Sequence, residues 1–192
     1  RKHFDQALTD YKQLKAKATT TERRQLAATG MLRSAAMMQD DVETIAAATD
    51  MLAEAKLTPE LRNEALYFRA KAYLNQQADK KAMNDLQALA KDTRTLYGAE
   101  AKYLVALQLY KAHEYAAAEK EILNFIEQST PHAYWLARSF ILLSDVYVAM
   151  DKKLDARQYL LSLQQNYHAD DDIESMIESR LNNLCLLYTS PS

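Results

Sequence analysis

Residues 66–89 read LYFRAKAYLNQQADKKAMNDLQAL, two apolar-periodic segments separated by a short polar stretch. The second segment contains Ala82-x3-Leu86-x2-Leu89, a small residue followed by large apolar residues at helical spacing. The first segment places Ala70 twelve residues before Ala82. Small residues let two helices approach closely, and large residues three or four positions away fill the groove between them. This stretch therefore predicts a pair of packed helices.

The same pattern recurs along the chain at a nearly constant spacing. Further copies are Ala118-x3-Ile122-x2-Phe125, Ala156-x3-Leu160-x2-Leu163, Ala7-x3-Tyr11-x2-Leu14 and a less regular Ile45-x3-Thr49-x2-Leu52. The first residues of the five copies are spaced 38, 37, 36 and 38 residues apart. Ala106 and Ser144 repeat the second small residue, again twelve positions earlier. A period of this size is typical of arrays of helix pairs.

Composition agrees with an all-α chain and excludes several classes of function. The 192 residues include only two Gly and three Pro, and 48% are apolar, enough for a core. The 24 basic and 26 acidic residues are interspersed without a basic stripe, so we expect no nucleic-acid partner. The apolar runs are far shorter than the ~20 residues that a membrane span requires, so we expect no membrane insertion.

The paired pattern resembles the tetratricopeptide repeat. Tyr73 and Tyr147 match the tyrosine of the family's first helix, and Ala82, Ala118 and Ala156 match the alanine of its second helix. The resemblance covers roughly residues 3–167, although the period is ~2–4 residues longer than the usual 34, and Ala or Ser replaces the family glycine. It implies an all-α fold, a right-handed α-solenoid of helix-turn-helix repeats.

The repeats define the domain organisation that we expect. Residues 1–184 form a single array with a half-repeat at 3–18, helix pairs at 21–56, 59–92, 97–128 and 132–167, and a capping helix at 171–184. Thr58 and Thr130, each followed by Pro, mark helix starts. Residues 185–192, CLLYTSPS, resemble a translated sequencing adapter, and we expect them to be non-native. The rest resembles the C-terminal part of a larger bacterial protein of this family.

No catalytic or metal-binding pattern is found in the sequence. The four histidines show no metal-ligand spacing, and the glycines Gly30 and Gly98 are too far apart for a phosphate-binding loop. Helix electrostatics explains the acidic residues after His168, and the only cysteine lies in the tail expected to be non-native. We therefore expect no enzymatic activity, no metal site and no cofactor.

In tetratricopeptide-like stacks the first helices line the concave face, so the resemblance implies where a partner binds. Three residues before each small residue of the first helices, and one residue after it, lie aromatic, aliphatic and charged side chains that suit a helix or an extended peptide. At these positions the expected groove residues are Met31, Tyr67, Lys71, Tyr103, Leu107, Ile141 and Asp145, and Tyr110 and Arg138 fall on neighbouring groove positions. The alternative is that these residues only pack against the next helix.

The function implied by this resemblance is that of a protein–protein interaction scaffold. A peptide or partner protein would bind in the concave groove, and family-level analogy extends this to assembly in the bacterial periplasm or cell envelope. The alternative is a structural spacer within a larger protein whose active or binding part lies in an N-terminal region outside this sequence.

Overall fold

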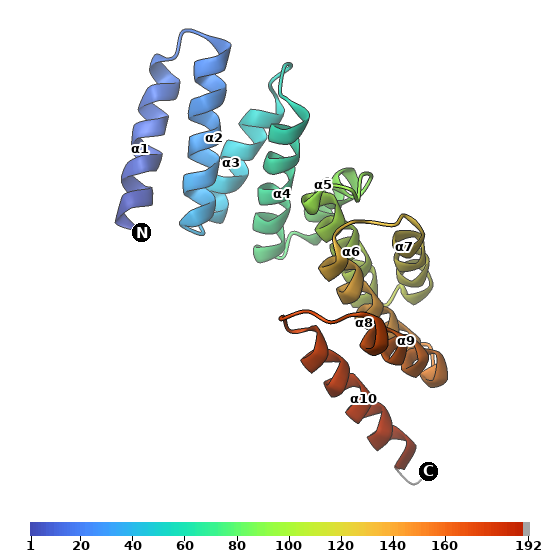
Figure 1. Ribbon diagram of the computed structural model, residues 1–192. Helices are drawn as coiled ribbons and strands as arrows, with labels where there is room; N and C mark the ends of the chain where they lie inside the picture. Colours follow the sequence, from blue (N-terminus) through green and yellow to red (C-terminus); the bar gives the residue numbers. More distant parts are fainter. Residues whose placement is uncertain (190–192) are drawn as a thin grey trace. The chain divides into compact units, whose positions relative to one another are not determined.

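The computed structural model describes residues 1–189. Over this range it contains ten α-helices and no strand, which confirms the expected all-α class (Figure 1). The helices are α1 (Lys2–Lys17), α2 (Thr21–Met37), α3 (Asp41–Leu52), α4 (Pro59–Asn75), α5 (Asp79–Leu89), α6 (Leu96–Lys111), α7 (Tyr115–Glu127), α8 (Ala133–Ala149), α9 (Lys153–Asn166) and α10 (Ile173–Thr189). Within the tail expected to be non-native, α10 continues through residues 185–189, whereas residues 190–192 lie outside the described residues.

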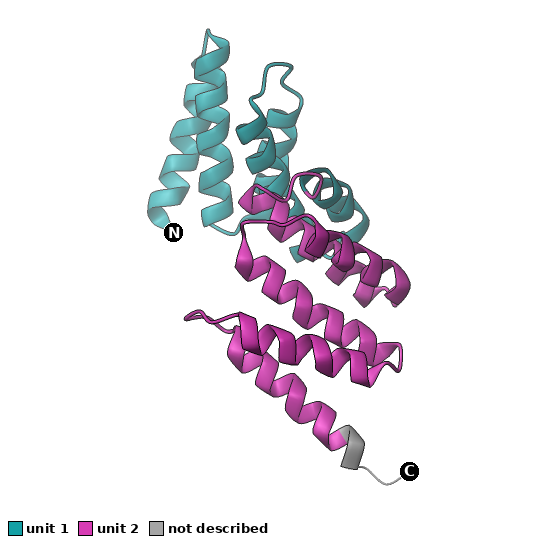
Figure 2. Cartoon of the chain, turned by 45° about the vertical axis from the view of Figure 1, so that its right-hand side comes forward, with its two compact units in different colours: residues 1–89 teal, residues 90–192 magenta. Residues whose placement is uncertain are grey.

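The chain divides into two compact units, residues 1–89 and residues 90–192 (Figure 2). In the first unit each helix from α1 to α5 packs on the next one along the chain, and α2 also contacts α4. In the second unit each helix from α6 to α10 packs on the next, and α8 also contacts both α6 and α10. We call α2, α4, α6 and α8 the first helices, and α3, α5, α7 and α9 the second helices. None of the helices over residues 1–189 combines the length and apolar character of a membrane span.

One turn geometry joins the helices of all four pairs. The turns place Gln39, Gln77, His113 and Asp151 at positive φ, at spacings of 38, 36 and 38 residues. In each turn the following N–H donates to the carbonyl five residues back, as from Ala78 to Tyr73 at 2.8 Å. This long bond closes a Schellman turn, which satisfies carbonyls that a helix end leaves without intrahelical partners.

The turn also sets the register of the second helix. Five residues after the positive-φ residue of each of these turns lies a small residue that is at most 3% exposed. These residues are Thr44, Ala82, Ala118 and Ala156.

 The corresponding core residues of α3 are therefore Thr44, Ala48 and Met51. The sequence pattern had suggested Ile45, Thr49 and Leu52, one residue later, and this register is wrong because Ile45 and Leu52 are only half-buried and Thr49 is exposed. The run Ala46–Ala48 explains the error, since it offers no contrast between small and large residues.

The connections from second helices to first helices also share a feature. The side chains of Thr20, Thr58 and Thr95 cap α2, α4 and α6. Each hydroxyl oxygen accepts a hydrogen bond from the backbone N–H of the third residue of its helix, with N to O distances of 3.2, 3.3 and 3.0 Å. Such caps satisfy one of the free N–H groups of a helix start. Because α1 is followed by the same threonine cap as α3 and α5, it holds the place of a second helix. At the other end, α10 contacts α8 and α9 and extends past the expected end at residue 184.

Candidate partner-binding site

Equivalent positions on the first helices can be counted back from the positive-φ residue of each turn. Ten residues before it lie Tyr67, Tyr103 and Ile141, as the sequence pattern predicts, but the equivalent residue in α2 is Thr29. Met31 instead lies in the hydrophobic core of the first unit, in a cluster that includes Met51 of α3. The expected position in α2 was wrong for the same reason as the register of α3. The first helix pair is rich in alanine, so its sequence shows little contrast between small and large residues.

The nine residues expected in the groove differ in exposure. Met31, Tyr103 and Ile141 are buried, so their side chains serve packing within their own unit. The other six are half-buried and can contribute surface to a partner: Tyr67, Lys71, Leu107, Tyr110, Arg138 and Asp145. Of the nine expected residues, only these six therefore have side-chain surface that a partner could contact.

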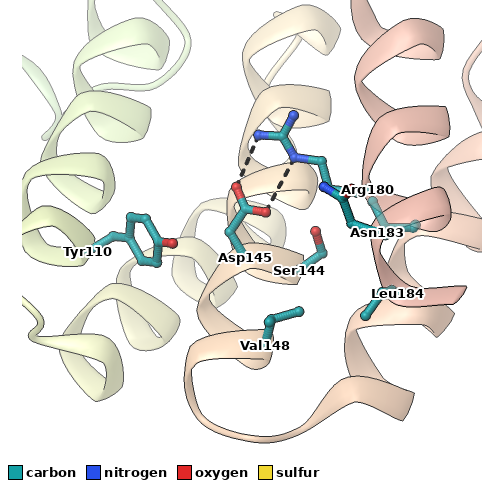
Figure 3. Close-up of a pocket in the computed structure, with 8 residues that line it drawn as sticks. Tyr110, Ser144, Asp145, Val148, Arg180, Asn183 and Leu184 are labelled. Carbon is teal, nitrogen blue, oxygen red and sulfur yellow. Dashed lines mark hydrogen bonds and ion pairs between the residues drawn. The ribbon is translucent and has the colours of Figure 1, made fainter. Parts of the chain in front are cut away.

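In the second unit, α6, α8 and α10 line a pocket of about 290 Å³ (Figure 3). The Tyr110 side chain extends from α6 toward Asp145 of α8, as Figure 3 shows. The remaining lining residues come mainly from α8 and α10: Ser144, Val148, Leu160, Arg180, Asn183 and Leu184. The pocket thus combines an aromatic wall with apolar and charged side chains.

An ion pair forms the charged wall of this pocket. Arg180 Nε and Nη2 donate to the two carboxylate oxygens of Asp145 at 3.3 and 3.2 Å, which links α10 to α8. Burial, and then the negative charge of Asp145, raise the pKa of Tyr110. The Tyr110 phenol therefore remains protonated at neutral pH and can donate a hydrogen bond to a ligand.

The first unit has a pocket of about 180 Å³ between α2 and α4. Its apolar lining includes Met37, Tyr67 and Phe68, and Lys71 lies beside them with its Nζ 5.8 Å from the centroid of the Tyr67 ring. Lys71 and Asp145 both lie six residues before the positive-φ residue of their turn. Ala36 and Tyr110 both lie three residues before it. The two pockets therefore occupy the same place in the repeat.

Two of the expected residues are brought together but are bonded to each other. Arg138 Nη2 donates to the Tyr103 hydroxyl at 3.0 Å, and Arg138 Nη1 donates to the Tyr134 hydroxyl at 3.2 Å. The Tyr134 hydroxyl donates to Asp172 at 3.0 Å, and the ring of Trp135 lies 5.6 Å from that of Tyr103. This cluster links α6, α8 and the segment before α10, so its primary role is structural.

Sequence reasoning missed the pocket residues on α10. Arg180 and Asn183 line the pocket of the second unit, whereas the sequence pattern suggested only a capping role for this helix. Arg180 follows its partner Asp145 by 35 residues, close to one repeat. That spacing between opposite charges was a usable signal, because equivalent positions of neighbouring repeats lie about 36–38 residues apart in the chain.

In the part of the chain that the structure describes, no three His, Cys, Asp or Glu residues are grouped so that they could hold a metal ion. No protein-family model matches the chain, and no curated protein matches it.

Proposed function

We propose that the chain is a protein–protein interaction scaffold built from tetratricopeptide-like helix pairs in an α-solenoid. The contacts within each unit support this reading, because first helices contact first helices and each second helix packs on its own first helix. The shared turn geometry, recurring every 36–38 residues, supports it as well.

The observation that carries the proposal is the recurrence of a pocket at one position of the repeat. A pocket lies between successive first helices in each unit, with Lys71 in the first and Asp145 at the equivalent position in the second. A single pocket could arise by chance from imperfect packing. Two pockets at equivalent positions are better explained by a surface that accepts one side chain of a ligand in each unit.

The size and lining of the pockets indicate the kind of ligand. Volumes of about 180 and 290 Å³ lie below the usual range of pockets for whole small molecules and suit single large side chains. Aromatic walls beside a charged residue are typical of positions where a peptide inserts an anchor residue. We therefore propose a peptide or partner protein that contributes one anchor side chain to each pocket.

A displayed peptide library tests this proposal directly. Peptides selected against the full chain should bind at least tenfold more weakly to Tyr110→Ala or Lys71→Ala, because each substitution removes one wall of a pocket. The matched control is Lys120→Ala, at an exposed position on the second helix α7, and it should leave binding unchanged. Failure to select any peptide, or equal binding to all three variants, would contradict the proposal.

The alternative of a structural spacer is favoured by one observation. Arg138, which was expected to contact a partner, already bonds to Tyr103 and Tyr134 of its own unit. A spacer would yield no peptide that depends on Tyr110 or Lys71, so the same selection distinguishes the two functions.

A further inference from the structure

The pocket of the second unit has an apolar side and a polar side. Val148, Leu160 and Leu184 form the apolar side, and Leu160 and Leu184 are at most 3% exposed, so the pocket reaches the core of the unit. Asp145 and Arg180 belong to the polar side, which lies above Val148 and Leu184 in the view of Figure 3. A ligand side chain that fills this pocket therefore contacts both apolar and polar groups.

The opening belongs to this position of the repeat and does not depend on α10 alone. In the first unit the equivalent pocket lies between α2 and α4, and the second helix α5 follows α4 and packs on it. Among the residues that line that pocket, none belongs to α5. A helix that packs on the equivalent face of α10 would therefore leave the pocket of the second unit open.

The polar side of the pocket has no net charge. Asp145 and Arg180 bind each other through both carboxylate oxygens, and their side chains are 24% and 32% exposed. No other described residue that lines the pocket is charged. A charged ligand group would therefore lose water without gaining a counter-charge of its own, which costs free energy. The charge balance thus favours an uncharged ligand group.

Several hydrogen-bonding groups of the pocket have no partner within the described residues. They are the Tyr110 hydroxyl, the Asn183 carboxamide and the third guanidinium nitrogen of Arg180, Nη1. The Ser144 hydroxyl donates to the Ile141 carbonyl at 2.7 Å, so its oxygen can still accept a hydrogen bond. The pocket therefore offers a ligand both donors and acceptors.

These groups discriminate between the side chains that a partner could insert. An apolar side chain would exclude water from the Tyr110 hydroxyl and the Asn183 carboxamide and leave them unpaired, which costs free energy. A site built to form hydrogen bonds strongly rejects an analogue that lacks the polar group. A carboxamide is uncharged, donates two hydrogen bonds and accepts others through its carbonyl oxygen. A side chain that ends in a carboxamide therefore matches the pocket better than an apolar or a charged one.

We propose that the pocket of the second unit binds the carboxamide of a glutamine side chain from the partner, and that the Asp145–Arg180 pair determines this selectivity. The carboxamide oxygen accepts hydrogen bonds from Arg180 and Tyr110, and its nitrogen donates to Ser144. The two methylene groups of the glutamine pack on the apolar side of the pocket. This glutamine is one anchor residue of the partner, so the inference rests on the function proposed above.

Titration of the full chain with capped amino acids tests the proposal without any variant. The probes are the N-acetyl, N-methylamide derivatives of glutamine, glutamate and methionine, whose side chains have similar lengths but differ in charge and polarity. Nuclear magnetic resonance of the isotope-labelled chain follows the Arg180 Nε–H and the Asn183 side-chain amide. We expect capped glutamine to shift both signals saturably, and capped glutamate and capped methionine to bind at least tenfold more weakly.

The variant Asp145→Asn tests the role of the ion pair, because it leaves Arg180 without its counter-charge. We expect this variant to bind capped glutamate at least tenfold more tightly than the parent chain does, and capped glutamine within threefold of the parent. Asp155→Asn is the matched control and should keep the preference of the parent, since Asp155 is an exposed acid of α9 that does not line the pocket. Circular dichroism verifies that each variant retains its helices. The ranking of the three probes on the parent chain remains decisive if Asp145→Asn does not fold.

The proposal is overturned if capped methionine or capped glutamate binds the parent chain as tightly as capped glutamine, or if no probe shifts the pocket signals. It is also overturned if a folded Asp145→Asn variant keeps the preference of the parent. Selected peptides that depend on Tyr110 but insert an apolar anchor would overturn this inference and leave the proposed function intact. Failure to select any peptide, together with glutamine-selective binding, would contradict the scaffold function and still support the carboxamide selectivity of the pocket.

Discussion

At the scale of single residues, the four turns within the helix pairs use a conformation that favours glycine, yet none of them contains glycine. Gln39, Gln77, His113 and Asp151 have φ between 57° and 62°. A residue with a Cβ is less stable than glycine in this region, because the Cβ crowds the following carbonyl oxygen. The four turns are therefore places where the chain holds a small amount of strain.

Replacing Gln77 by glycine should stabilise the chain. We expect Gln77→Gly to raise the free energy of unfolding by about 0.5–1 kcal/mol, because the relief of strain exceeds the extra entropy of glycine in the unfolded chain. Urea unfolding followed by circular dichroism measures the change. Gln76→Gly is the matched control, since Gln76 has a φ of −86° and glycine there should destabilise. A stabilisation of equal size by both substitutions would contradict the explanation.

A second prediction at this scale concerns Tyr147, a buried residue of α8. Burial, and then the nearby Glu119 carboxylate, raise the pKa of Tyr147 from 10.0 to about 12. Between pH 10 and 12 the unfolded chain loses this proton while the folded chain keeps it, so stability falls as pH rises. Between pH 10 and 12, we expect the free energy of unfolding of Tyr147→Phe to fall by roughly 2 kcal/mol less than that of the parent chain. Urea unfolding at pH 8, where both states are protonated, provides the reference.

At the scale of the helices, one buried ion pair joins the helices of the second pair. Arg69 of α4 donates two bonds to Asp85 of α5 and a third to Thr49 of α3, at 3.2 Å. The bonds to Asp85 raise the pKa of Arg69 despite partial burial. Asp85 is only 4% exposed, so its charge depends on Arg69 for compensation.

Removing only one partner of this pair should therefore be costly. We expect Arg69→Leu to lower the free energy of unfolding by about 3 kcal/mol, because it leaves the Asp85 carboxylate buried without a counter-charge. The double variant Arg69→Leu, Asp85→Leu should recover most of this loss. Urea unfolding of the parent and both variants gives the values. Arg94→Ala, at an exposed ion pair with Asp92, is the control and should leave stability unchanged.

The helices themselves could be predicted from the sequence, because their signals are strong. The spacing of Ala82, Ala118 and Ala156 places three second helices in the correct register, and buried residues at these positions explain why. The first pair was harder to read, because Thr44 is polar and the following alanines resemble one another in size. There the turn at Gln39, which no sequence motif marks, determines which face is buried.

At the scale of the whole molecule, several side-chain hydrogen bonds between helices join residues that lie about one repeat apart in the sequence. Asn75 of α4 bonds to Asp41, 34 residues earlier, and Arg180 of α10 bonds to Asp145, 35 residues earlier. Sequence patterns predict which helices are equivalent. A spacing of about one repeat suggests which opposite charges can meet, but it does not single out the pairs that do, since long side chains reach across several positions. This is why Tyr110 and Asp145 were identified as candidates while Arg180 was not.

The last helix provides a test of how the second unit is completed. Ile173, Ile177 and Leu184 of α10 are at most 3% exposed, and burial of each such side chain contributes about 1.5–3 kcal/mol. A chain that ends at residue 166 should therefore lose roughly 5 kcal/mol of stability or more, with exposed apolar surface that binds a hydrophobic dye.

A chain that ends at residue 184 keeps all three side chains and removes only the segment that resembles an adapter. We expect it to melt within a few degrees of the parent, as measured by circular dichroism. If it melts as early as the shorter chain, residues 185–189 belong to the fold, and their interpretation as a non-native tail is wrong.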